Sequence, residues 1–438
     1  MKKLIYTSLF ALLVCFTAQG QKVLTLEECI NIALDNNLNI KRARNTAVGA
    51  RSGFTQSKLN FLPFVSASSG ANWNEGNALN TAFERVSVNN WNASSSVNAS
   101  INIFNGLATI NTLAQSKLQY EASLDNIENT MLNTKVSIVG AYLAVIQGRE
   151  NLNISEQALS ILEEQLSREE KREAAGVGNM ESVYNFRSRV ANQRLDVVSN
   201  QNRLKSSELT LIQLLLLDPS EDYEFPPLTV SDALLTSSLP EYKEVYEKTI
   251  NFSPSLRASE SQLKASQKGV QIAKSNRLPS LGASAGYSTG WTSSSDETFL
   301  DQYDLNQRKS LGFNLSIPIF NNGRTSNQIQ QAKVRMMGSE LDLEIAKNTL
   351  TNLVQQAYLD LVNAHSQYQA ANENMEALNK SFEFSKNRYE SGTTDFVTYL
   401  QNLNEKNQGE FRLANAKYAF LLRDLVLKLY MGEQQLGN

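Results

Sequence analysis

Four stretches of the chain alternate apolar or small residues with polar residues at every second position. They lie at 65–73, 91–103, 281–291 and 311–319, and their polar positions carry Ser, Asn and Gly with almost no charge. A period of two is the period of a β-strand that presents one face to an apolar environment. Stretches of roughly 9 to 13 residues also match the length that a tilted strand needs to cross a bilayer. The pattern therefore predicts two hairpins of membrane strands.

The three tryptophans mark one end of these strands. Trp73, Trp91 and Trp291 adjoin polar linkers expected at 74–90 and 292–307. Such a position predicts an interfacial aromatic girdle beside exposed loops. The alternation alone would also fit a soluble sheet with one wet face. The uncharged polar faces, and the isolation of the hairpins between long helices, favour the membrane.

Long segments without proline follow each hairpin, at 106–171 and 322–389. As continuous helices they would each be ~100 Å long. Apolar residues in the second segment recur alternately every four and three residues, a 3.5-residue period that predicts supercoiled helix packing. The stripe consists of Leu350, Val354, Ala357, Leu361, Ala364, Tyr368, Ala371, Met375, Leu378 and Phe382.

Each long helix should end at a glycine-containing break and return as a second helix, to about Leu217 in the first half and Met431 in the second. Shorter helical stretches precede the hairpins at 26–59 and 241–277. We expect them to break near Asn36 and at Ser253-Pro254.

The two halves of the chain are related by duplication. A constant offset of 216 residues aligns Leu62-Pro63 with Leu278-Pro279 and Gly176 with Gly392, without a gap. One register held over such a length predicts the same fold for both halves. The expected segments are a first repeat at 21–217, a proline-containing connector at 218–240, a second repeat at 241–432 and a tail at 433–438.

Residues 1–20 have the features of a cleaved secretory signal. Lys2 and Lys3 precede an apolar stretch, and Ala18 and Gly20 place small residues before a cut at Gln21. Cleavage would remove Cys15 and leave Cys29 without a disulfide partner in its own chain.

Composition argues against catalysis. Among 438 residues there are one His and two Cys, too few for a His- or Cys-rich metal site, so we expect no enzyme activity, metal or cofactor. His365 lies beside the apolar stripe and is interpreted as a packed or tunnel-facing residue. The 41 basic and 44 acidic side chains leave a net charge of −3, which disfavours nucleic acid as a partner. A mean hydropathy of −0.33 is too polar for a helical membrane protein.

Four strands cannot cross a membrane as an open sheet, because lipid cannot satisfy the backbone groups of the edges. Two copies would give eight strands and a filled interior, whereas three would give twelve and leave a lumen. The predicted fold is therefore mainly α with membrane β: a duplicated protomer supplying four strands of a trimeric twelve-stranded barrel, continued by a long α-helical barrel.

Several segments of the chain carry a family resemblance. They are the duplicated strand starts at 62–63 and 278–279, the strand exits at 101–106 and 317–323, and the segment Tyr389-Glu390-Ser391-Gly392. Over essentially the whole mature chain, the sequence resembles the TolC-type outer-membrane efflux channels. The resemblance implies a homotrimer in contact with outer-membrane lipid and a helical tunnel in the periplasm. It also implies a periplasmic adapter and an inner-membrane partner, either a resistance-nodulation-division pump or an ATP-driven exporter.

The resemblance also implies site residues. The periplasmic tips that an adapter grips would be Gly176, Val177, Gly178 and Asn179 in the first half, and Gly392, Thr393, Thr394 and Asp395 in the second. Tyr389 matches a position associated with the closed gate. The best-known members place carboxylates shortly after the second glycine, where this chain has Thr398 and Gln401, with Ser182 and Asn185 in the first half. This difference leads to the hypothesis of a gate closed by Tyr389 and neutral hydrogen bonds.

The expected function is a passive exit duct for small toxic compounds in a tripartite efflux system, powered from the inner membrane. One alternative is a type I duct for unfolded protein, since tunnel residues do not separate the two cargoes. Another is a periplasmic coiled-coil structural protein without a pore.

Overall fold

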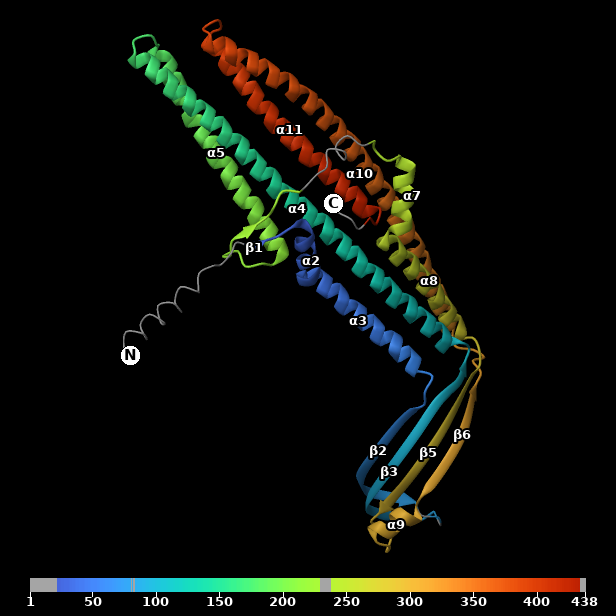
Figure 1. Ribbon diagram of the computed structural model, residues 1–438. Coiled ribbons are helices and arrows are strands. Elements are labelled where there is room, and N and C mark those ends of the chain that lie inside the picture. The colour runs from blue at the N-terminus through green and yellow to red at the C-terminus, as the bar shows by residue number, and fades with distance from the viewer. Residues whose placement is uncertain (1–21, 80, 82, 229–237, 434–438) are drawn as a thin grey trace, which may run out of the picture. The chain divides into compact units, whose positions relative to one another are not determined.

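The computed structural model describes residues 22–79, 81, 83–228 and 238–433, and its elements repeat in the two halves of the chain (Figure 1). The predicted signal segment at 1–20, residues 229–237 of the predicted connector and residues 434–438 of the predicted tail lie outside the described residues. The first half contains β1 (Lys22–Val23), α2 (Leu26–Asn36), α3 (Leu38–Leu59), β2 (Phe64–Leu79), β3 (Arg85–Asn105), α4 (Ala108–Ala174) and α5 (Met180–Leu215). The second contains β4 (Tyr223–Glu224), α7 (Tyr242–Phe252), α8 (Pro254–Ser275), β5 (Ser280–Thr292), α9 (Phe299–Leu305), β6 (Arg308–Ser316), α10 (Arg324–Glu390) and α11 (Phe396–Tyr430).

Both halves contribute to each of two compact units. The strand unit consists of Arg44–Asn126 and Ser255–Lys347, and the helical unit consists of Met1–Ala43, Ile127–Pro254 and Asn348–Asn438. The duplicated halves are therefore interleaved in each unit, instead of forming one unit apiece.

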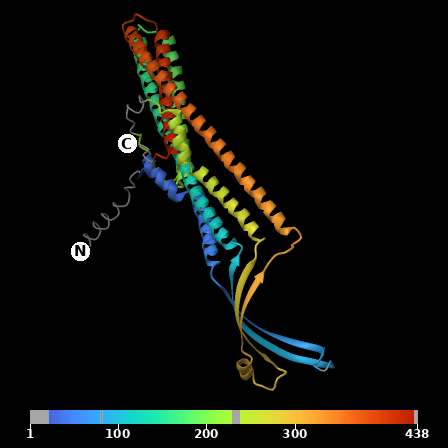
Figure 2. The same cartoon turned by 90° about the vertical axis from the view of Figure 1, so that its right-hand side faces the viewer.

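In the strand unit, the two predicted hairpins join into one antiparallel sheet of order β2-β3-β5-β6 (Figure 1). The first hairpin is longer than expected, because the segment assigned to a polar linker at 74–90 continues the ladder to the pair Leu79 and Arg85. Val86 and Val88 keep a β-branched residue at every second position there, and pairing satisfies backbone groups. Beyond the end of β5 this two-stranded ribbon curves away from the rest of the sheet (Figure 2). The second linker, at 292–307, contains the helix α9.

Two details of strand register depart from strict alternation. A bulge between Asn102 and Phe104 places Phe104, instead of Ile103, opposite Leu281 on the apolar face. The last strand ends at Ser316, so Ile317 and Ile319 lie outside the ladder. Pro318 has no N–H to donate, which explains why the ladder stops there.

The predicted helices and breaks are confirmed. α2 and α3 are separated at Asn37, and α7 and α8 at Ser253, directly before Pro254. Thr25 and Glu28 form a reciprocal capping box at the start of α2. Behind it Cys29 is fully buried, and this burial raises the pKa of its thiol to about 12, so Cys29 is an inert core residue.

The 3.5-residue stripe of α10 is confirmed as a packing face. Each of its members is buried or half-buried, and the return helix α11 lies beside it in the helical unit. A Cβ added at Gly409 of α11 would lie 2.6 Å from Leu378 Cδ1, so the absence of a side chain permits the close approach of the two helices. His365 packs against Phe420, with ring centroids 5.1 Å apart, as expected of a packed residue.

Candidate functional site

The two helical hairpins of the helical unit, α4–α5 and α10–α11, end in short exposed turns at the same end of that unit (Figure 1). Gly176 and Gly392 have φ angles of 74° and 73°, the left-handed conformation that favours glycine after a helix. Asn179 and Asp395 then cap the return helices by accepting hydrogen bonds from backbone N–H groups. All eight predicted tip residues lie in these turns or at the caps.

The first turn is sterically tighter than the second. A Cβ added at Gly178 would lie 2.4 Å from the backbone N of Glu173, whereas no heavy atom of the described residues lies within 4 Å of the corresponding point at Gly392. At position 178 glycine is therefore required because a Cβ would clash with the backbone, whereas at position 392 it is favoured by the left-handed φ angle alone.

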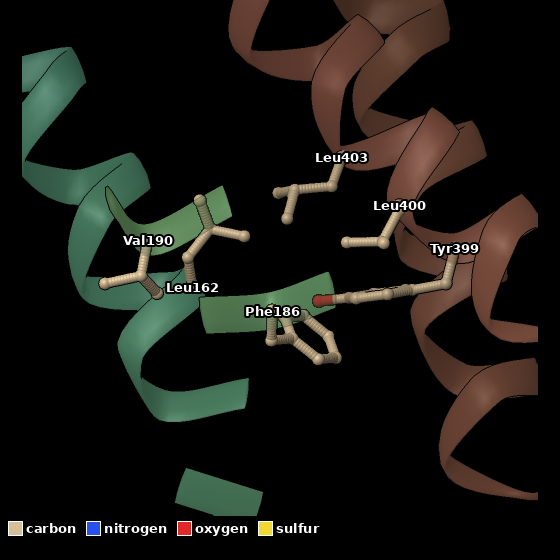
Figure 3. Packing of buried hydrophobic residues seen from close by; sticks show 6 residues of the cluster. All are labelled: Leu162, Phe186, Val190, Tyr399, Leu400 and Leu403. Atoms are coloured by element: carbon tan, nitrogen blue, oxygen red, sulfur yellow. The ribbon is translucent and has the colours of Figure 1, made fainter. Parts of the chain in front are cut away.

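Behind the turns an apolar cluster joins the two hairpins (Figure 3). Phe186 and Val190 of α5, with Leu162 of α4, face Tyr399 and Leu403 of α11, and Leu400 completes the set. Phe186 is also edge-on to Phe396, with a centroid distance of 4.5 Å. We call these six residues, Leu162, Phe186, Val190, Tyr399, Leu400 and Leu403, the inter-hairpin cluster.

Tyr389 links the two hairpins on the tip side of this cluster. Its ring stacks on Tyr399, with centroids 4.8 Å apart and planes 14° apart, and its hydroxyl donates a 2.8 Å hydrogen bond to Oε1 of Glu169 on the other hairpin. Burial, followed by the hydrogen bond to Glu169, raises the pKa of Tyr389, so the phenol retains its proton and acts as the donor.

Charged groups surround this hydrogen bond. The side chain of Glu169 is only 5% exposed and also receives a 3.4 Å contact from Arg172 of its own helix. A second link between the hairpins is the 3.3 Å ion pair of Arg168 with Glu390, whose side chains are more exposed. We refer to the Tyr389–Glu169 hydrogen bond and the Arg168–Glu390 ion pair together as the tip clasp.

The neutral hydrogen bonds expected at Tyr389 are not what the structure shows, since its acceptor is a carboxylate. The sequence hypothesis looked for partners of Tyr389 only among the positions that follow each turn glycine. The acceptor, Glu169, instead lies before the first turn, 220 residues from Tyr389 in the sequence. A charge run at Arg168–Glu173, at the end of a long helix, was the available signal.

The other predicted gate residues do not gather around Tyr389. Thr398 bonds to the cap Asp395, and Gln401 donates to Glu405 one turn further along α11. On α5, Ser182 is half-buried and Asn185 is exposed. Tyr399 has a buried hydroxyl with no hydrogen-bond partner among the described residues, although its ring belongs to the cluster.

The strand unit places the predicted girdle residues together. Trp73 and Trp91 are directly opposite each other, and Trp291 is opposite Ala93, so all three lie at neighbouring positions on one face of the sheet. At the other end of the sheet, large exposed aromatic residues form a second set that sequence reasoning missed. Its members are Phe61, Phe64, Phe104 and Phe320.

No described residues bring three potential metal-binding side chains together. None of the described helices combines the length and apolar character needed to cross a membrane.

Comparisons with known proteins agree with this architecture. The family model described as "Outer membrane efflux protein" matches residues 29–215 and again residues 245–433. The chain is 22% identical to the outer membrane protein TolC of Vibrio cholerae over 414 residues, which cover 93% of this chain and 90% of that protein.

Two solved structures show the same fold. The outer membrane protein VceC of Vibrio cholerae superposes with a TM-score of 0.76 at 17% identity, covering 93% of this chain and 96% of VceC. The CmeC outer membrane channel of Campylobacter jejuni gives a TM-score of 0.75 at 19% identity, covering 94% of this chain and 87% of CmeC. The predicted fold class, a duplicated and mainly α-helical chain that supplies membrane strands, is confirmed.

Proposed function

This chain belongs to the outer membrane efflux protein family, a family of export channels and not of enzymes, and on that premise we propose that it forms the exit duct of a tripartite efflux system. In this proposal three copies assemble in the outer membrane, and small toxic compounds pass through the pore without being chemically altered. A periplasmic adapter and an inner-membrane pump or ATP-driven exporter would supply the gating and the energy.

The unpaired edges of the sheet support assembly from several copies. Among the described residues β2 and β6 each have one strand neighbour, so a row of backbone N–H and C=O groups remains open on each outer side. Those groups cannot face lipid unpaired, because the hydrocarbon core offers no hydrogen-bonding partner. Pairing β2 of one copy with β6 of the next closes the sheet, and twelve strands leave an interior lumen.

Exposed apolar residues on the helices support the same assembly. In the strand unit, one side of α10 carries large side chains at helical spacing that are exposed in the single chain: Val334, Met337, Leu341 and Ile345. In the helical unit, Leu195 and Val198 of α5 are likewise exposed. Burial of such groups is favourable by ~25 cal/mol per Å² of apolar surface, and a neighbouring copy can cover them.

The tip clasp supports a role for the turns as a gate. Tyr389–Glu169 and Arg168–Glu390 both join the two hairpins of one chain, so separation of the hairpins breaks both contacts. The exposed turns beyond the clasp, at 176–179 and 392–395, are the parts of this unit that a periplasmic adapter could reach first. An adapter that draws one turn away from the other would thereby release the clasp.

The observation that carries the proposal is a four-stranded sheet with one apolar face and two open edges. To test it, the protein would be extracted from outer membranes in mild detergent, its protein mass measured by light scattering, and the sample added to a planar bilayer. A trimer with discrete conductance steps is expected. A monomer or dimer without conductance would refute the channel.

Copurification then identifies the partners. Tagged protein, crosslinked in cells before extraction, should retain a periplasmic adapter and either a resistance-nodulation-division pump or an ATP-driven exporter. Recovery of a conducting trimer without either class of partner would leave the pore intact and remove the tripartite assignment.

A further inference from the structure

The short helix α9, in the connection between β5 and β6, packs on one face of the sheet (Figure 1). Thr289 Oγ1 donates a 2.6 Å hydrogen bond to the carbonyl of Tyr303, and the Tyr303 hydroxyl lies 3.2 Å from Ser95 Oγ. The Phe299 ring lies 5.7 Å from Trp291. Residues 289 and 291 share a face with Leu281, so α9 covers the apolar face and not the Ser, Asn and Gly face that would line a lumen.

A polar boundary crosses the apolar face where α9 is attached. Ser69 pairs with Ser95, and Ser95 pairs with Thr289, so three hydroxyl side chains form a row across β2, β3 and β5. On β6 the corresponding change occurs one pair earlier, at Lys309 opposite Tyr287. On the other side of this boundary the exposed residues of β6 on this face are large and apolar: Leu311, Phe313 and Leu315.

The distance from the opposite end of the apolar face to the tryptophan girdle agrees with a membrane interface at this level. From Leu281 to Trp291 the strand advances ten residues, ~33 Å at about 3.3 Å per residue. A strand tilt of about 40° reduces this length to ~25 Å, the usual height of the apolar band of a membrane barrel. α9, which contacts Trp291 and Thr289, therefore lies at the edge of that band.

The side chains of α9 divide into a set that faces the sheet, two leucines on the flanks and two aspartates on the outer side. Gln302 is 3% exposed and bonds to both the N–H and the carbonyl of Thr292, which holds the helix against β5. Leu300 and Leu305 are 77% and 70% exposed. At 100° per residue they lie on opposite flanks of the helix, while Asp301 and Asp304 lie on the side away from the sheet. Nothing in the described chain covers these two leucines.

We propose that α9 binds the lipid of the outer leaflet at the membrane interface, which extends the tryptophan girdle beyond the strands. Leu300 and Leu305 lie among the upper acyl chains, and Asp301 and Asp304 face the headgroups and water. Lipid is the fitting partner because α9 is continuous with the apolar face of the sheet, on the headgroup side of its polar boundary. The inference rests on the proposed function, since it needs that face to contact lipid.

The test measures the depth of single tryptophans. The background is W73F/W91F/W291F, and the added substitutions are L300W and L305W on α9, S294W in the connection before α9, and F313W near the opposite end of the apolar face, where Phe313 pairs with Ala283. Each variant is checked for trimer mass and reconstituted in phosphatidylcholine vesicles whose acyl chains are brominated close to the headgroup. L300W and L305W should lose roughly half of their emission to bromine, because interfacial side chains reach ~5–10 Å into the headgroup and acyl boundary. S294W should instead be quenched by aqueous acrylamide.

Acrylamide quenching of L300W and L305W as strong as that of S294W, without an effect of bromine, would overturn the proposal. F313W separates this failure from a failure of the channel itself. If bromine quenches F313W but not the α9 variants, only the α9 proposal is lost; if F313W also escapes bromine, the sheet does not face lipid. Should the tryptophan-free background not form trimers, a nitroxide attached to L300C in the natural background replaces the fluorophore. Faster relaxation by oxygen than by a water-soluble nickel complex is then expected, and the reverse order would contradict the proposal.

Discussion

Replacing Tyr389 by Phe tests the clasp with the smallest possible change. The substitution removes one hydroxyl and retains the ring that stacks on Tyr399. The lost interaction is a 2.8 Å hydrogen bond to the carboxylate of Glu169. Hydrogen bonds to charged groups contribute about 1.5–3 kcal/mol, and removal of the donor leaves a nearly buried carboxylate whose remaining ion pair among the described residues is the one with Arg172.

This free energy converts into a channel-opening equilibrium. A loss of about 1.5–2 kcal/mol per clasp shifts the balance between joined and separated hairpins by roughly 10- to 30-fold. If the three clasps of a trimer open together, the factors multiply to ~10³ or more. We therefore expect Y389F to show a much higher open probability than the wild type in planar bilayers without adapter.

Tyr399→Phe provides the matched control. Tyr399 belongs to the same stacked pair, but its hydroxyl is buried without a partner among the described residues. Its removal breaks no hydrogen bond there and relieves the cost of burying a polar group, about 1–3 kcal/mol. Y399F should keep the channel at least as closed as the wild type. An unchanged open probability in Y389F, or an equal increase in both variants, would refute the reasoning.

Three further predictions concern the tips. Arg168→Gln should raise the open probability far less than Y389F, because the ion pair to Glu390 is exposed and such pairs contribute about 0–1 kcal/mol. An increase larger than that of Y389F, measured at the same salt concentration, would contradict this ranking. The raised pKa of Tyr389 predicts that the clasp is complete below pH ~10, the ordinary phenol pKa, and is lost as the pH rises through the higher pKa of the closed state. Conductance should therefore increase in alkaline solution more in the wild type than in Y389F. Equal pH dependence of conductance in the two proteins would exclude Tyr389 as the responsible group. Gly178→Ala should disrupt its turn more than Gly392→Ala does. The Gly392 substitution costs about 1 kcal/mol, because it places a left-handed residue where there is free space around the added Cβ. Protease cleavage at the two turns measures the difference, and greater cleavage in G392A than in G178A would contradict this ranking.

Local patterns were sufficient for the duplication and for most of the secondary structure, although not for the helix α9. The period-two stretches predicted all four strands of the sheet, and the period of 3.5 predicted the packing face of α10, because side-chain direction repeats with the backbone geometry. The breaks at Asn37 and Ser253 followed from equally local features. Errors arose where pairing extends a strand beyond its pattern, as in the ribbon that ends at Leu79 and Arg85.

The duplication could not predict the clasp, because the two halves diverge at the positions that form it. At the offset of 216 residues, Tyr389 corresponds to Glu173 and Glu169 corresponds to Ser385, so the reciprocal contact cannot form. Which residue accepts the Tyr389 hydrogen bond depends on how the two hairpins pack, and a neighbour 220 residues away leaves no periodic signal.

The sequence by itself determined the repeated order of helices and strands, the apolar face of the sheet and the positions of the turns, since each of these depends on residues close together in the chain. Only the tertiary structure decided that Glu169 receives the Tyr389 hydroxyl, that a bulge moves Phe104 onto the apolar face, and that α9 folds back onto that face beside Trp291. These features depend on register and packing between distant segments, where a shift of one residue along a strand exchanges the two faces.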